Sequence, residues 1–167
     1  MNRRTLLTAG LGGTAVAAAM GWYLTTAGAA GATDANETFP VTKTDAEWRA
    51  TLSPQQYAVL RRASTERPGS SPLNDEHRKG TFACAGCALP LFSSDTKFDS
   101  RTGWPSFWRP LDKAIGTHTD RSLGMARTEV HCAQCGGHLG HVFSDGPRPT
   151  GLRYCMNGVA LAFTPAA

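Results

Sequence analysis

The sequence predicts a mainly β, antiparallel domain that follows short helices and is held together by a metal ion. From Thr81 onward the chain consists of short alternating runs of apolar and polar residues, interrupted by Gly, Pro, Asp and Ser. Such a pattern is typical of antiparallel strands. Helical signals are confined to the segment before it. Two Cys-x-x-Cys pairs are the third observation, because pairs of this kind commonly bind a structural metal ion.

Length and composition are those of one globular domain. The 167 residues include 41% hydrophobic and 18% charged residues, which is enough to bury a core. The net charge is +4, and Arg3 and Arg4 supply two of the positive charges. The other basic residues are scattered along the chain, which argues against nucleic acid as a partner because a nucleic-acid binder needs a basic stripe.

Residues 1–32 are predicted to be a signal peptide that is not part of the fold. They contain Arg3 and Arg4, no acidic residue, and two Ala-Gly-Ala sites near their end, a pattern that signal peptidases recognise. The adjacent arginines followed by Thr-Leu-Leu resemble a twin-arginine signal, so we expect export to the periplasm. An uncleaved membrane anchor is the alternative, because the apolar run approaches the roughly 20 residues of a membrane span.

Residues 33–43 are predicted to be a linker, and residues 44–167 the working domain. Helical signals follow directly in "TDAEWRATLSPQQYAVLRRAS". Ser53 can cap a helix whose first residue is Pro54, and Gln56 completes a capping box. The buried face of this region is expected to contain Leu52, Tyr57 and Leu60.

Four of the five cysteines are predicted to bind a structural zinc ion. They are Cys84, Cys87, Cys132 and Cys135. Each Cys-x-x-Cys pair can present two thiolates from one tight turn, with Gly86 and Gly136 easing the backbone around the metal. The pairs are far apart in the chain, so the ion would join two distant β-hairpins. Two disulfides or a thioredoxin-like redox pair are the alternatives, because exported proteins meet an oxidising environment.

The fifth cysteine, Cys155, is a candidate nucleophile. The stretch "GLRYCMNGVALAF" is predicted to be one strand, whose alternate side chains share a face. Arg153, Cys155 and Asn157 would then lie together, and the same face would continue through Val159, Leu161 and Phe163. A guanidinium beside the sulfur favours the thiolate. A buried structural cysteine is the alternative, but such a thiol has no use for two polar neighbours.

Two histidines and a tryptophan are further candidates for the site. His138 and His141 could act as acids, bases or ligands. Strict alternation along a strand would place them on opposite faces, so a shared site requires a bulge or turn, which Gly140 could supply. Trp104 in "RTGWPSFW" could form an aromatic wall for an apolar ligand group. It could equally pack in the core, and composition does not choose between the two.

Taken together, these residues resemble the type B methionine sulfoxide reductases, which act on methionine-R-sulfoxide. The matching segments are "TERPGSSPLN", "GTFACAGCALPLFSSDTKFDSRTGWPSFW", "RTEVHCAQCGGHLGHVFSDGPRPTG" and "LRYCMNGVALAF", and they cover nearly all of residues 55–164. The resemblance implies two small antiparallel sheets that carry the active site on one face. It also implies that Zn²⁺ lies far from the chemistry.

The resemblance implies a role for each candidate residue. Cys155 would attack the sulfoxide sulfur, release methionine and become a sulfenic acid. His138 and His141 match residues that position and protonate the sulfoxide oxygen. Asn157 and Arg153 match residues that organise the site. Trp104 and Phe143 match residues that contact the substrate.

One position departs from the family pattern. Many members have "SGCGW" where this chain has "SRTGW", and their additional cysteine attacks the sulfenic acid to form a disulfide. Thr102 stands at that position here, and Arg101 precedes it. A threonine hydroxyl cannot form a disulfide, so we expect a one-cysteine enzyme whose sulfenic acid is reduced by an external thiol.

The resemblance also implies oxidised proteins as substrates, and we expect an external thioredoxin-like reductant. The leader lies outside the matching segments, and from its arginine pair we expect the twin-arginine export machinery as a further partner. We expect a monomer. A binding module with the same two-knuckle zinc fold is the rival hypothesis. Such a module would not need Cys155, His138 and His141 together, and all three are present.

Overall fold

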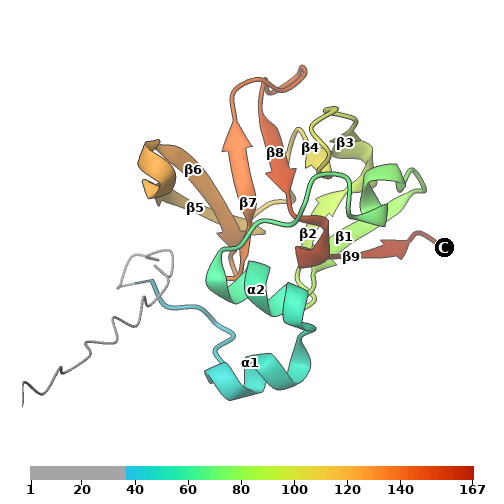
Figure 1. Cartoon of the computed structure of the whole chain (residues 1–167). Coiled ribbons are helices and arrows are strands. Elements are labelled where there is room, and N and C mark those ends of the chain that lie inside the picture. The colour runs from blue at the N-terminus through green and yellow to red at the C-terminus, as the bar shows by residue number, and fades with distance from the viewer. Residues whose placement is uncertain (1–36) are drawn as a thin grey trace, which may run out of the picture.

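A computed structural model describes residues 37–167 of the chain (Figure 1). The predicted signal peptide and the first part of the predicted linker lie outside the described residues, and the part of the linker from residue 37 to 43 has no regular secondary structure. Two antiparallel sheets, of three and six strands, form the body of the domain. The two helices lie beneath them in Figure 1. The predicted mainly β fold with short N-terminal helices is confirmed.

The two helices, α1 (Asp45–Thr51) and α2 (Pro54–Arg62), both begin with a capping box. At the start of α2 the Gln56 N–H donates to the Ser53 hydroxyl at 3.2 Å, and the Ser53 N–H donates to the Gln56 side chain at 3.0 Å. The predicted buried residues Leu52, Tyr57 and Leu60 all lie in the core. Among residues 37–167, neither helix has the length and apolar character needed to cross a membrane.

The larger sheet has the strand order β3-β4-β8-β7-β6-β5. Its members are β3 (Lys97–Phe98), β4 (Ser106–Phe107), β5 (Ile115–Asp120), β6 (Arg127–Cys132), β7 (His138–Phe143) and β8 (Arg153–Met156). The neighbouring strands β7 and β8 carry the candidate histidines and the candidate nucleophile. Figure 1 shows this pair between β6 on one side and β4 on the other.

The smaller sheet has the order β2-β1-β9, with β1 (Gly80–Cys84), β2 (Pro90–Ser93) and β9 (Leu161–Pro165). Three phenylalanine rings join it to the larger sheet. The Phe107 ring of β4 stacks on Phe92 of β2 with centroids 4.3 Å apart, and meets Phe82 of β1 edge-on at 5.0 Å. All three side chains are fully buried, so apolar burial holds the sheets together.

Short 3₁₀ helices connect several strands: η1 (Pro72–Asp75), η2 (Ser94–Thr96), η3 (Ser122–Gly124) and η4 (Gly158–Ala160). The last of these contradicts the prediction of one strand from residue 151 to 163. Strand β8 ends at Met156, η4 follows, and β9 then pairs in the other sheet. Val159, Leu161 and Phe163 therefore do not continue the face of Cys155.

The break between β8 and β9 has a local cause. The Glu66 carboxylate accepts the backbone N–H groups of Gly158 and Val159 at 2.6 and 2.9 Å, and so takes the donors that a continuing strand would offer to a neighbour. A Cβ atom at Gly158 would lie 2.0 Å from the Ser71 hydroxyl. Only glycine allows this close approach.

Strand β7 contains the irregularity that a shared histidine site requires. In the β6–β7 ladder Val130 pairs with Gly140, whereas the next residue, His131, pairs with His138. Leu139 is therefore an extra residue in β7, and such a bulge changes which side chains share a face. The His138 and His141 rings lie with their centroids 5.5 Å apart.

Gly140 also lets β8 come close to β7. A Cβ atom there would lie 2.1 Å from the carbonyl oxygen of Cys155. A side chain at this position would push β8, and with it the candidate nucleophile, away from the histidines.

Candidate functional site

A small cavity of about 110 Å³ lies beside β7 and β8. Residues from several segments line it: Thr65, Trp104, Arg127, Gly140, His141, Phe143, Cys155 and Asn157. Five of the seven residues predicted from the sequence for catalysis or substrate binding are among them. The other two, His138 and Arg153, lie outside the lining. A larger hollow of about 730 Å³ between α2 and the segment 64–73 contains no cysteine or histidine, so the small cavity is the candidate site.

Cys155 is half-buried and free, and it sits between two neighbouring strands. In the backbone register it faces His141 of β7 on one side and Ser106 of β4 on the other. The Thr102 hydroxyl lies 3.8 Å from the Cys155 sulfur. Thr102, at the position where the resemblance implies a second cysteine in many family members, is therefore in contact with the sulfur.

Arg153 lies on the same strand as Cys155 but is held by an acid. Its guanidinium donates two hydrogen bonds to Asp145, both 2.9 Å long, and lies over the Phe143 ring at 4.3 Å. The hydrogen bond to Asp145 is the main cause that raises the pKa of Arg153, and the nearby Cys155 contributes to the same shift. Arg153 thus keeps its positive charge beside Asp145, on the strand that carries Cys155.

His141 is linked to an acid that the sequence did not single out. Its Nε2 lies 2.9 Å from the Asp120 carboxylate, which also accepts a hydrogen bond from Arg127 at 2.6 Å. Burial lowers the pKa of His141, and the hydrogen bond to Asp120 partly opposes this effect. His141 is therefore mainly neutral near pH 7. When its Nε2–H donates to Asp120, its lone pair is on Nδ1.

His138 belongs to a buried group of three side chains centred on Glu129. The Glu129 carboxylate lies 2.6 Å from Nδ1 of His138 and 2.5 Å from Nε2 of His118. Burial opposes the charge of Glu129, but the hydrogen bond and positive charge of His138, with the charge of His118, outweigh it and lower the pKa of the carboxyl. Glu129 thereby fixes the orientation of the His138 ring, whose Nε2 has no partner among the described residues.

Asn157 and Trp104 are positioned by one backbone segment. The Glu66 N–H donates to the Asn157 side chain at 2.9 Å, and the Trp104 ring N–H donates to the Glu66 carbonyl at 3.2 Å. Both the backbone N–H and the side-chain amide of Asn157 also donate to the carbonyl of Leu139, at 2.8 and 3.1 Å. The β7 bulge residue therefore fixes Asn157 as well.

The four remaining cysteines form one cluster between the two sheets. Their sulfur atoms lie within 4.8 Å of one another. The close contacts cross between the pairs, with Cys84 3.8 Å from Cys135 and Cys87 3.5 Å from Cys132. A disulfide is about 2.05 Å long, and all four thiols are free, so the alternative of two disulfides is wrong. The cluster can hold a metal ion, and it joins the β1–β2 turn to the β6–β7 turn as predicted.

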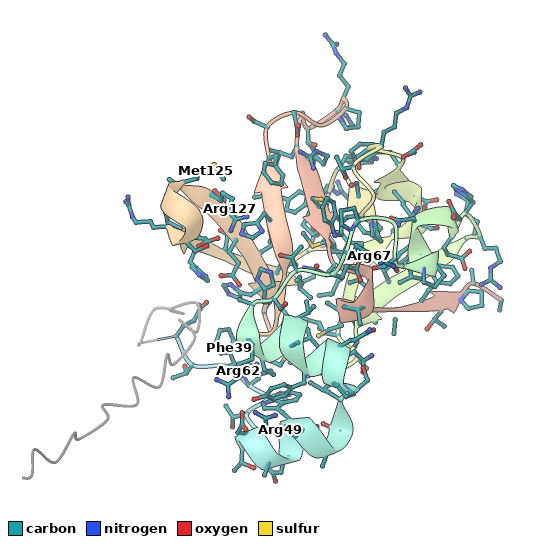
Figure 2. All side chains as sticks on the ribbon, in the orientation of Figure 1. Phe39, Arg49, Arg62, Arg67, Met125 and Arg127 are labelled. Atoms are coloured by element: carbon teal, nitrogen blue, oxygen red, sulfur yellow. The ribbon has the colours of Figure 1, made fainter. Side chains whose placement is uncertain are left out.

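The two cysteine turns have the same backbone geometry. Ala88 donates to the carbonyl of Cys84 at 2.8 Å, and Gly136 donates to that of Cys132 at 2.9 Å. Both donors have a left-handed backbone, with φ of 62° and 65°. The prediction for Gly136 is therefore confirmed, whereas in the first turn the left-handed residue is Ala88, not Gly86. Phe39 packs directly on Gly136, beside the base of β7 (Figure 2).

Known proteins share this domain. The SelR domain family matches residues 52–165. The peptide methionine sulfoxide reductase MsrB of Pseudomonas putida (strain W619) is 59% identical over 126 residues, which are 75% of this chain and 95% of that protein. The corresponding protein of Agrobacterium fabrum is 55% identical over 126 residues, 75% of this chain and 93% of its own length. The chain belongs to the MsrB family of peptide methionine sulfoxide reductases.

Several residues of this MsrB-family site carry no signal in the sequence. Arg127 lines the cavity from the start of β6, close to the exposed Met125 (Figure 2). Asp120 holds His141, and Glu129 holds His138. The backbone of Glu66 holds both Asn157 and Trp104. A charged residue within an alternating strand is normally assigned to the face of the strand that is exposed to solvent.

Removal of the negative charge of Glu129 should lower the free energy of unfolding of this MsrB-family protein. The change Glu129→Gln leaves two buried imidazoles without a carboxylate, so we expect a loss of about 2 to 3 kcal/mol of unfolding free energy at pH 7. The pKa of Glu129 is lowered from its ordinary value of 4.5 in the folded protein. The stabilisation is therefore present above about pH 4.5 and is lost as the pH falls through the lower folded value. Urea unfolding at a series of pH values measures the difference.

A matched control is Asp112→Asn, which removes an exposed carboxylate. It should change stability by less than about 0.5 kcal/mol. If the Glu129→Gln difference stayed constant from pH 7 to pH 3, the carboxylate would not be the source of the stabilisation.

Proposed function

We propose that the protein reduces the R epimer of methionine sulfoxide, mainly in proteins, to methionine, with Cys155 as the nucleophile. Membership of the MsrB family supports methionine sulfoxide reduction in general. The observation that carries the residue assignment is the cavity itself. It places a free thiol, an imidazole and two aromatic rings around a space suited to one small side chain, through Cys155, His141, Trp104 and Phe143.

The proposed reaction transfers one oxygen atom to Cys155. The thiolate sulfur attacks the sulfoxide sulfur and forms a sulfur–sulfur bond, and one proton is delivered to the sulfoxide oxygen. The resulting hydroxyl moves to the Cys155 sulfur as the sulfur–oxygen bond of the substrate and the new sulfur–sulfur bond both break. Methionine leaves and Cys155 keeps the oxygen as a sulfenic acid. The two electrons that reduce the substrate come from the cysteine sulfur. An external dithiol then reduces the sulfenic acid with release of water.

Each neighbouring residue has a distinct task in this proposal. His141 lines the cavity and delivers the proton to the sulfoxide oxygen. His138 lies outside the lining, is held by Glu129, and has an Nε2 atom without a partner among the described residues. Asn157 and Arg153 orient the site and favour the thiolate. Trp104 and Phe143 contact the methyl group of the substrate, as apolar walls with a few polar groups do in many ligand sites.

The reductant is proposed to be an external thioredoxin-like protein. Cys84, Cys87, Cys132 and Cys135 are all within the metal-site cluster, and Thr102 lies where a second cysteine would reach Cys155. No other cysteine is present in the chain. An exported enzyme would meet this reductant in the periplasm, and the arginine pair in the leader supports export by the twin-arginine machinery. The enzyme is proposed to be a monomer. N-terminal sequencing of the protein recovered from the periplasm tests the export and the cleavage.

The metal is proposed to be a structural zinc ion. Four thiolates about 2.3 Å from Zn²⁺ in a tetrahedron are separated by about 3.8 Å. The cross-pair sulfur distances of 3.5 and 3.8 Å fit this geometry. All-cysteine sites with four ligands are typical of structural zinc, which leaves no open position for chemistry.

The proposed nucleophile predicts a clear loss of activity. Cys155→Ser should lower kcat/KM for methionine-R-sulfoxide by about a thousandfold or more, because a neutral hydroxyl is a far weaker nucleophile than a thiolate. The wild-type protein should consume the R epimer and leave the S epimer unchanged. Chromatography of the separated epimers with dithiothreitol as reductant measures both. Equal consumption of the two epimers, or turnover by the Cys155→Ser variant, would contradict the proposal.

The proposed zinc site predicts a change in stability. Purified protein should contain one zinc per chain, and Cys132→Ser should lose it together with roughly 10 °C of melting temperature, because metal binding contributes directly to folding. Elemental analysis and thermal unfolding provide the two readouts. Cys155→Ser is the matched control and should keep the zinc. A Cys132→Ser protein of unchanged stability would show that the cluster has no structural role.

A further inference from the structure

Three hydroxyl groups form a chain that ends at the Cys155 sulfur. Thr102 lies 3.8 Å from the sulfur, Ser100 lies 2.8 Å from Thr102, and Ser106 lies 2.7 Å from Ser100. At the far end the Ser106 hydroxyl donates to the backbone carbonyl of Trp104 at 3.1 Å. Ser106 is completely buried and the other two are half-buried. None of these hydroxyls has another hydrogen-bond partner among the described residues.

The number of hydrogens in this chain depends on the state of Cys155. The chain has four links, from the sulfur through Thr102, Ser100 and Ser106 to the Trp104 carbonyl. A hydroxyl supplies one hydrogen and the carbonyl supplies none. When Cys155 is a thiol, four hydrogens fill four links, and every group donates in the direction of Trp104. In that state Thr102 accepts from sulfur and gives no hydrogen bond to it.

Loss of the thiol proton to water leaves three hydrogens for four links. The thiolate is a strong acceptor, and a hydrogen bond to a charged acceptor is stronger than one to a neutral carbonyl. All three hydroxyls therefore turn, so that Ser106 donates to Ser100, Ser100 to Thr102, and Thr102 to the sulfur. The link that stays empty is the 3.1 Å contact to the Trp104 carbonyl, the longest of the oxygen–oxygen links.

We propose that Thr102, Ser100 and Ser106 act as a reversible hydroxyl chain whose Thr102 end donates a hydrogen bond to the Cys155 thiolate. The inference rests on the proposed function, in which this thiolate is the nucleophile. Thr102 is the residue in contact with the reacting sulfur. Ser100 and Ser106 are positioning residues that act through it, because each must turn its hydroxyl before Thr102 can donate.

Charged and titratable groups around Cys155 remain in place in the test. They are two arginines, Arg127 on β6 and Arg153 on β8, and the mainly neutral His141 on β7, each held by an acid. None of them contacts the hydroxyl chain among the described hydrogen bonds. Substitutions in the chain therefore leave the charges near the sulfur unchanged.

The test is the pH dependence of Cys155 alkylation in the zinc-containing protein. Iodoacetamide reacts with the thiolate, and mass spectrometry of the peptide that contains Cys155 gives the rate at each pH. Thr102→Val keeps the shape of the side chain and removes the hydroxyl. We expect it to raise the pH midpoint of alkylation by about one unit, which corresponds to the loss of one hydrogen bond to a charged acceptor.

Two control variants separate the hydroxyl from the shape of the side chain. Thr102→Ser keeps the hydroxyl and should restore the midpoint of the wild-type protein. Thr117→Val makes the same chemical change at an exposed position of β5 and should have no effect. A midpoint that does not move in Thr102→Val would overturn the proposal. Since alkylation requires no sulfoxide, this result is independent of whether the protein reduces methionine sulfoxide.

A second comparison tests the chain beyond its first link. Ser100→Ala should raise the midpoint by a smaller amount, and it should add nothing in the Thr102→Val background, because the two residues act in series. Ser100 is half-buried, so this variant remains informative if Ser106→Ala fails to fold. Fully additive shifts would show that Ser100 acts on the sulfur by another route, and the chain would be ruled out.

Discussion

The meeting of four thiols between the two sheets is the constraint on which the rest of the site depends. It ties the turn after β1 to the turn before β7, so the first residue of β7 starts from a fixed point. Leu60 of α2 packs against both turns, close to Gly86 and Gly137. The helix, the small sheet and the large sheet therefore meet at this cluster. The cavity at Cys155 lies farther along β7 and β8, away from the four cysteines.

A single extra residue in β7 brings the side chains of the candidate site together. The bulge at Leu139 turns His138 to the side of His141, and the Leu139 carbonyl accepts both donors of Asn157. Gly140 then allows β8 to approach closely enough for Cys155 to face His141. Local backbone irregularity therefore brings histidine, asparagine and cysteine together, and the buried pair of Glu129 with His138 holds one of the two rings in place.

Much of this arrangement could be predicted from residue types and spacing. The capping box at Ser53, the two cysteine turns and the exceptional position of Cys155 all follow from local chemistry. The break at Gly158 could not be predicted, because its cause is the Glu66 carboxylate, 92 residues away in the chain. The same holds for Asp120, Glu129 and Arg127. Their partners lie on other strands of the larger sheet, and only the register of the sheet brings them together.

The central claim is that Cys155 alone carries the chemistry and that no cysteine of the chain restores it. The most direct measurement is mass spectrometry of the zinc-containing protein after one equivalent of methionine-R-sulfoxide, with dimedone present and no reductant. A single dimedone adduct on Cys155, formed in proportion to the methionine released, is the predicted result. A disulfide between Cys155 and any of the other four cysteines would contradict the claim.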